Sequence, residues 1–78
     1  MKITYSRAAV KVINSMDSAK KQRIKAGIEK LPEGDIKPLQ GSKGSYRLRV
    51  GNWRILFSYP EDDTILIEKI GPRGGVYK

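Results

Sequence analysis

The sequence predicts an α+β domain. We expect an N-terminal strand, a helical hairpin and a three-stranded antiparallel meander, forming a four-stranded sheet with helices on one face. Three observations support this fold class. Apolar residues recur at helical spacing between residues 9 and 31. They alternate with polar residues between residues 46 and 50, the pattern of a half-buried strand. A chain of 78 residues has room for one compact core, so we expect a single domain spanning residues 1–78.

The first third of the chain fits a strand followed by two helices. Residues 2–5 are the strand candidate, and Ser6 is placed to cap the first helix. The apolar stripe of this helix consists of Ala9, Val12, Ile13 and Met16. Asp17 or Ser18 can cap a second helix, which Pro32 ends because proline disfavours helical geometry in the residue before it. The stripe of the second helix consists of Ile24, Gly27, Ile28 and Leu31.

The rest of the chain fits a loop and three strands. Residues 32–45 are rich in Gly, Pro, Ser and charge, which is typical of a loop that returns the chain to the sheet. Residues 46–50 and 53–59 are separated only by Gly51-Asn52, which predicts a two-residue hairpin. The consecutive apolar residues within 64–70 predict a central strand covered on both faces, and its register stays open.

The composition narrows the classes of function. Neither cysteine nor histidine occurs, so we expect no metal site and no cofactor. The net charge of +8 favours a polyanionic partner, although a basic surface that only keeps a small protein soluble would give the same composition. We find no apolar run of membrane-spanning length and no signal-peptide pattern at the start. We therefore expect a cytoplasmic protein without a membrane partner.

The predicted hairpin gathers three arginines on one face of the sheet. A two-residue loop pairs Arg49 with Arg54 and places Arg47 on the same face. The opposite, core face then consists of Leu48, Val50, Trp53, Ile55 and Phe57. Like charges directly opposite each other cost stability, so this pattern predicts an anionic partner. An ordinary solvated sheet face is the alternative.

These residues resemble those of a known family. The segment Tyr46-Arg47-Leu48-Arg49-Val50-Gly51-Asn52-Trp53-Arg54-Ile55-Leu56-Phe57, with Ile70-Gly71-Pro72-Arg73 and Val76-Tyr77, is similar to the RelE family of toxin–antitoxin ribonucleases. The resemblance implies a ribosome-dependent endoribonuclease, or mRNA interferase. Such an enzyme enters the ribosomal A site beside the 16S rRNA. It cuts the messenger there without a metal, by attack of a ribose 2′-hydroxyl on the adjacent phosphate. The resemblance also implies an acidic, RelB-like antitoxin that silences the toxin.

The resemblance implies site residues as well. It assigns catalysis to Arg54, Arg73 and Tyr77. It assigns RNA binding to Arg47, Arg49 and Lys43. The two catalytic arginines would stabilise charge on the reacting phosphate, and the tyrosine would pack against a base or sugar. Arginine stands where the best-known relatives have lysines, and a guanidinium is a poor general base. The general base stays open among Lys43, Glu68 and Tyr77. We expect Glu68 to be the strand-face partner of a nearby arginine.

Two other functions fit part of the pattern. ParE-like toxins, which act on DNA gyrase, share the fold but lack the full set of basic residues and tyrosine. A plain RNA-binding module would share the basic face and need no catalysis.

Overall fold

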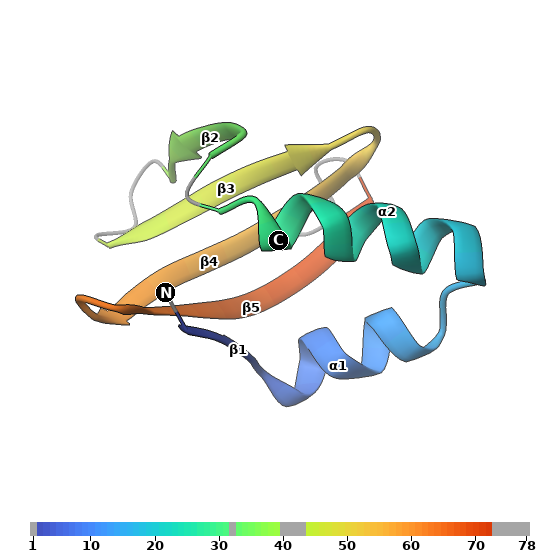
Figure 1. The fold of residues 1–78 in the computed structure, drawn as a ribbon, viewed down its shortest axis with the longest axis horizontal. Helices are drawn as coiled ribbons and strands as arrows, with labels where there is room; N and C mark the ends of the chain where they lie inside the picture. Colours follow the sequence, from blue (N-terminus) through green and yellow to red (C-terminus); the bar gives the residue numbers. More distant parts are fainter. Residues whose placement is uncertain (1, 32, 40–43, 73–78) are drawn as a thin grey trace.

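The computed structural model describes residues 2–31, 33–39 and 44–72, which form two helices and a five-stranded sheet (Figure 1). The helices are α1 (Arg7–Asn14) and α2 (Ser18–Glu29). The strands are β1 (Lys2–Tyr5), β2 (Asp35–Pro38), β3 (Ser45–Val50), β4 (Trp53–Glu61) and β5 (Thr64–Pro72). Their order across the sheet is β1-β5-β4-β3-β2. The predicted α+β class and order of elements are confirmed, with one strand more than expected.

Both helices begin at the predicted caps. The Ser6 hydroxyl accepts a hydrogen bond from the Ala9 N–H at 3.0 Å, and the Asp17 carboxylate accepts one from the Lys20 N–H at 2.9 Å. These oxygens satisfy backbone donors that have no partner within the helix. Neither described helix is long and apolar enough to cross a membrane.

The sheet is mixed. β3, β4 and β5 form the predicted antiparallel meander, while β1 pairs in parallel with β5. The additional strand, β2, lies in the segment expected to be a loop, and it pairs antiparallel with β3 at the edge of the sheet. It escaped prediction because only Ile36 in it is apolar and packs on the core. The strand also contains Pro38, a residue that sheets tolerate at an edge.

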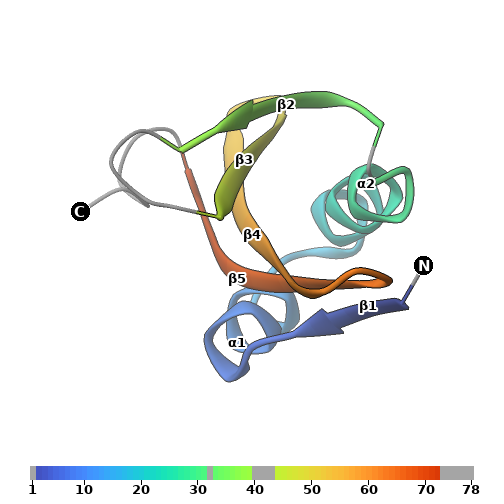
Figure 2. The ribbon, with the colours of Figure 1, turned by 90° about the vertical axis from the view of Figure 1, so that its left-hand side faces the viewer.

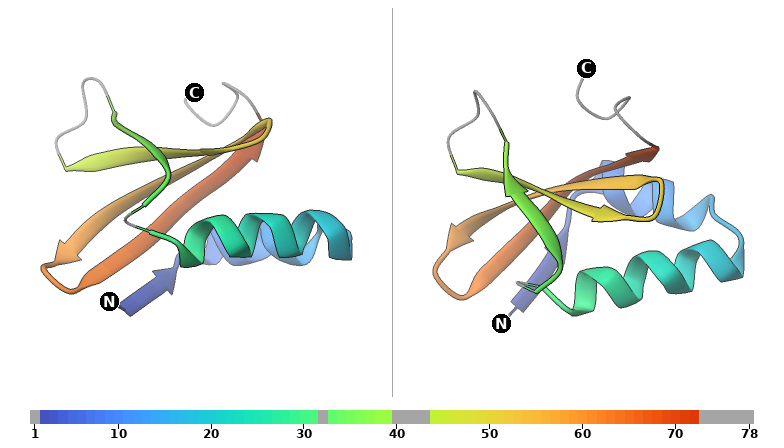
Figure 3. Two further views of the ribbon diagram at one scale, coloured as in Figure 1. Left: turned by 45° about the horizontal axis from the view of Figure 1, so that its top comes forward. Right: turned by 90° about the horizontal axis from the view of Figure 1, so that it is seen from above.

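One hydrophobic core joins the helices to the sheet. Both helices contribute to it, as do β3, β4 and β5 and the turn that follows α2. Its residues are Ala9, Ile13, Ile24, Ile28, Leu31, Leu48, Ile55, Phe57, Ile65, Ile67 and Ile70. α2 lies across one face of the sheet, and α1 lies beside β5 where β1 ends (Figures 2 and 3). Gly27 lets α2 approach β3 closely, because a Cβ at position 27 would lie 2.7 Å from Cγ2 of Val50 on that strand.

A β-bulge sets the direction of the side chains along β5. Leu56 pairs with Lys69, but the next residue of β4, Phe57, pairs with Ile67, so Glu68 is the extra residue. The irregularity lets Ile67 and Ile70 both reach the core although they are three positions apart, while Lys69 emerges on the other face. This explains why regular alternation could not supply the register of the strand.

Candidate nucleic-acid interface

The β3–β4 hairpin has the predicted register. Val50 pairs with Trp53 and Arg49 with Arg54 across a two-residue turn in which Gly51 has φ 59°. This left-handed conformation is one that glycine adopts without steric cost. Leu48, Ile55 and Phe57 are buried in the core, and Val50 and Trp53 pack against it half-buried, as predicted for this face.

The face of the sheet opposite the core collects cationic side chains from four adjacent strands. We call this set the basic face. It consists of Lys37, Arg47, Arg49, Arg54 and Lys69. The structure thus brings the three predicted arginines together and adds a lysine on either side. Sequence reasoning missed both lysines, because one lies on the unpredicted β2 and the other follows the bulge in β5.

The strand registers arrange the basic face in two neighbouring rows that cross the strands. The first row consists of Asp35, Arg49, Arg54 and Gly71. The second row consists of Lys37, Arg47, Leu56 and Lys69. Leu56 is only 7% exposed although it does not belong to the core cluster. Residues of one row lie on adjacent strands, so their backbones are separated by about 4.8 Å per strand.

An ion pair neutralises part of the first row. The Arg49 Nε donates to a carboxylate oxygen of Asp35 at 2.7 Å, and both side chains are exposed, by 51% and 39%. Asp35 therefore supplies one counter-charge to the opposed arginines within the domain, in addition to the anionic partner that the pattern predicts. Sequence reasoning did not predict this ion pair, because Asp35 lies on β2, in a segment that was expected to be a loop.

The two other arginines are half-buried and make no ion pair among the residues that the structure describes. Arg54 donates from Nη1 to the backbone carbonyl of Trp53 at 3.4 Å. This long hydrogen bond leaves most of the five guanidinium N–H donors of Arg54 for other partners. Arg47 lies one row away, opposite Leu56.

Glu68 contacts two serines in the described part of the chain. Its carboxylate accepts a hydrogen bond from the Ser58 hydroxyl at 3.0 Å, and its backbone carbonyl accepts one from the Ser6 hydroxyl at 2.7 Å. No arginine of the described chain pairs with it. Among the described residues, the bulge at Glu68 directs its carboxylate toward Ser58 instead, and a pair with Arg73, which lies outside the described residues, stays a prediction.

Three of the predicted site residues, Lys43, Arg73 and Tyr77, lie outside the described residues. Their roles in RNA binding and catalysis stay predictions.

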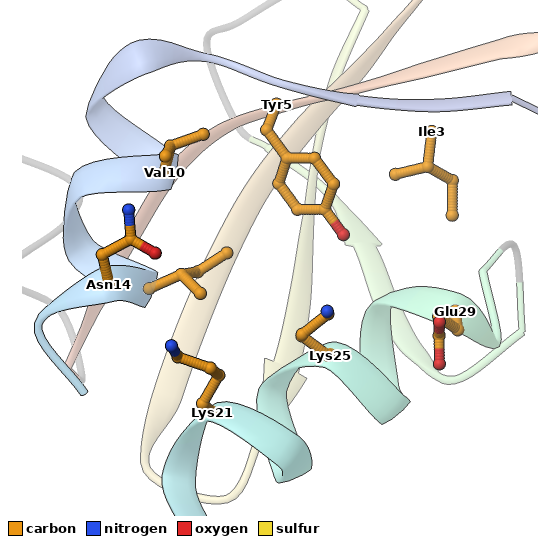
Figure 4. Close-up of a pocket in the computed structure, with 8 residues that line it drawn as sticks. Ile3, Tyr5, Val10, Asn14, Lys21, Lys25 and Glu29 are labelled. Atoms are coloured by element: carbon orange, nitrogen blue, oxygen red, sulfur yellow. The ribbon is translucent and has the colours of Figure 1, made fainter. Parts of the chain in front are cut away.

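A cavity of about 480 Å³ lies on the helical side of the molecule, between β1, α1 and α2 (Figure 4). Figure 4 shows the Tyr5 ring pointing into it with the hydroxyl toward α2. Burial raises the pKa of Tyr5 above its ordinary value of 10.0, and the negative charge of Glu29 raises it further. Of the predicted site residues that the structure describes, none lines the cavity.

Comparisons with known proteins identify the family. Residues 3–77 match the sequence model of the family described as the ParE toxin of type II toxin–antitoxin systems, parDE. Toxin RelE3 of Methanocaldococcus jannaschii is 31% identical, over 99% of this chain and 96% of that protein.

Solved structures agree with this identification. A chain in the crystal structure of the RelB–RelE antitoxin–toxin complex from Methanococcus jannaschii has a TM-score of 0.76 and 28% identity, over 95% of this chain and 94% of that one. A chain of the archaeal RelE–RelB complex from Pyrococcus horikoshii has a TM-score of 0.70 and 26% identity, over 95% and 96%. The chain therefore belongs to the RelE/ParE family of toxins from type II toxin–antitoxin systems.

Proposed function

We propose that this toxin is a ribosome-dependent mRNA endoribonuclease that acts without a metal. The observation that carries the proposal is the direct opposition of Arg49 and Arg54, with Arg47 in the neighbouring row, on the sheet face opposite the core. One internal carboxylate pairs with this group, so the face keeps a strong excess of positive charge. Such a group is suited to the phosphates of a nucleic acid.

The proposed reaction is attack of a ribose 2′-hydroxyl on the adjacent phosphorus. The 2′-oxygen forms a bond to phosphorus and loses its proton, while the bond from phosphorus to the 5′-oxygen breaks and that oxygen gains a proton. Negative charge develops on the phosphorane oxygens and on the leaving oxygen. Arg54 and Arg73 would stabilise this charge, because fixed cations favour a transition state whose charge they are positioned to meet.

The remaining predicted residues would hold the substrate. Arg47, Arg49 and Lys43 would bind neighbouring phosphates, and Tyr77 would pack against the base or sugar. No pair of a general acid and a general base is evident in the sequence. We infer that the ribosomal A site, including its 16S rRNA, aligns the messenger, since alignment alone can accelerate a reaction by several powers of ten.

The proposed partner in the resting state is an acidic, RelB-like antitoxin. The support comes from relatives, whose crystal structures are described as RelB–RelE complexes. A net charge of +8 would attract an acidic protein and accelerate its association.

A second candidate is inhibition of DNA gyrase, because the matching family model is described as the ParE toxin. Two assays on the purified protein separate the candidates. One incubates messenger with and without programmed ribosomes, and the other measures supercoiling by gyrase. We expect cleavage only with ribosomes and normal supercoiling. Loss of supercoiling without cleavage would identify a gyrase toxin, and equal cleavage of free messenger would refute the dependence on ribosomes.

A further inference from the structure

We propose that Lys37 and Lys69 extend the RNA site, so that a single RNA strand crosses the sheet along the second row and places successive phosphates near Lys37, Arg47 and Lys69. This inference rests on the proposed function and adds to it the path of the substrate. The set of site residues assigned from the sequence does not include these two lysines.

The register places the cations of the second row in a line. Lys37 pairs with Arg47, Arg47 with Leu56, and Leu56 with Lys69, on four consecutive strands. Three strand spacings of about 4.8 Å separate the backbones of the outer lysines by about 14 Å. This length exceeds the rise of roughly 3.4 Å per phosphate along one strand of a duplex, so the row can meet more than one phosphate.

The second row has no internal counter-charge. Among the residues that the structure describes, neither lysine nor Arg47 forms an ion pair, although Lys37 lies directly opposite Arg47. The first row shows that this sheet can place a carboxylate opposite an arginine, as it does with Asp35 and Arg49. A face that served only solubility would gain stability from the same arrangement in both rows, because opposed like charges are destabilising.

The chemistry of the row indicates contact with phosphates rather than reading of bases. Its polar members are two exposed lysines and one arginine, and it contains no aromatic side chain on which a base could stack. Lysine acts as a flexible point charge that binds phosphate without a directional requirement. The row would therefore position RNA independently of its sequence.

The test measures binding of a labelled oligouridine over a series of salt concentrations. Each phosphate contact on a single strand contributes roughly 0.7 to the slope of log K against log salt concentration. We expect the double variant Lys37→Ala/Lys69→Ala to flatten this slope by about 1.4, twice that contribution. The control is Lys11→Ala/Lys20→Ala, which removes the same charge from exposed positions of α1 and α2 and should leave the slope unchanged.

A third variant, Arg54→Ala, separates this inference from the proposed function. If Lys37→Ala/Lys69→Ala behaves like the helical control while Arg54→Ala abolishes cleavage, the path along the second row is wrong and the ribonuclease proposal stands. If Arg54→Ala cuts at the wild-type rate while the double variant flattens the slope, the row binds RNA and the proposed catalytic centre is wrong. Thermal unfolding of every variant confirms that binding is compared between folded proteins.

Discussion

The Asp35 carboxylate lies opposite Arg49 in the β2–β3 ladder and accepts a hydrogen bond from its Nε at 2.7 Å. This contact engages the Nε side of the guanidinium, and no described residue accepts a hydrogen bond from its two terminal nitrogens. An arginine held in this way can still donate two N–H groups to a phosphate. Asp35 thus orients Arg49 while lowering the positive charge of the basic face.

Replacing Asp35 by asparagine should tighten the binding of single-stranded RNA. Removing one negative charge beside the bound phosphates should raise the affinity roughly two- to fivefold at low salt, with the gain shrinking as salt screens the charges. The cost to stability should be small, because exposed ion pairs contribute about 0–1 kcal/mol. Binding titrations at low and high salt measure the effect.

Asp62→Asn is the matched control, since it removes the same charge from the exposed turn between β4 and β5. An equal gain in both variants would show that only the net charge matters. Weaker binding in Asp35→Asn would show that orienting Arg49 outweighs the charge that Asp35 removes.

Arg54→Ala and Arg73→Ala should each abolish most of the ribosome-dependent cleavage. By analogy with a deleted oxyanion-hole donor, the loss should be ~2.7–4 kcal/mol of transition-state stabilisation, or about 10²–10³-fold in rate. Arg54→Ala should leave stability within about 0.5 kcal/mol of wild type or raise it slightly, because the change relieves repulsion with Arg49. Cleavage kinetics and thermal unfolding are measured on the same preparations.

Trp53→Ala provides the contrasting case on the other face of the same strand. Trp53 packs against the core but is only half-buried, so its removal should cost less than the ~3–5 kcal/mol typical of large aromatic residues in cores. Its effect on activity should follow the fraction of folded protein. Unfolding of the domain by Arg54→Ala would overturn the assignment of the two sheet faces.

Gly27→Ala should destabilise the domain although alanine favours helices. The new Cβ would lie 2.7 Å from Cγ2 of Val50, and overpacking of this kind typically costs ~1–3 kcal/mol, against a gain of roughly 1 kcal/mol in helix propensity. Chemical denaturation measures the net change. In a double-mutant cycle, Val50→Ala should relieve the strain, so that the two changes together cost less than their sum. Simple additivity would contradict the close approach of α2 to β3.

Tyr5 should make the stability depend on pH in the alkaline range. Burial and Glu29 raise the pKa of Tyr5 in the folded state, so the folded chain retains this proton at a pH where the unfolded chain loses it. The contribution is therefore fully present below about pH 10 and is lost as the pH rises through the folded-state pKa. Tyr5→Phe should show a smaller decline above pH 10, and its stability relative to wild type should be constant below that. Parallel declines in the two proteins would contradict the shift.

The placement of the three arginines on one face could be predicted because it depends only on residues close together in the sequence. A two-residue turn sets the register of the β3–β4 hairpin, and the alternation of side chains then places Arg47, Arg49 and Arg54 on one face. The helix caps at Ser6 and Asp17 were predictable for the same reason, since each depends on a hydrogen bond spanning three residues.

The remainder of the basic face depends on non-local pairing. β2 has only one apolar residue directed at the core, so its pairing with β3 leaves almost no pattern in the sequence. The bulge at Glu68 interrupts the alternation in β5 and thereby conceals the direction of Lys69. Asp35, Lys37 and Lys69 were missed for these two reasons.

The pairing of β1 with β5 has a consequence for folding during synthesis. Ile3, near the start of the chain, pairs with Ile65, and β5 lies between β1 and β4 in the sheet. A nascent chain emerging from its own ribosome thus carries its first strand without a partner until residues 64–67 have been synthesised and have left the exit tunnel. Contacts between such distant residues also slow folding, because a long loop must close before they form. The sheet that carries the basic face is therefore completed only after β5, the last of the described strands in chain order, has left the exit tunnel.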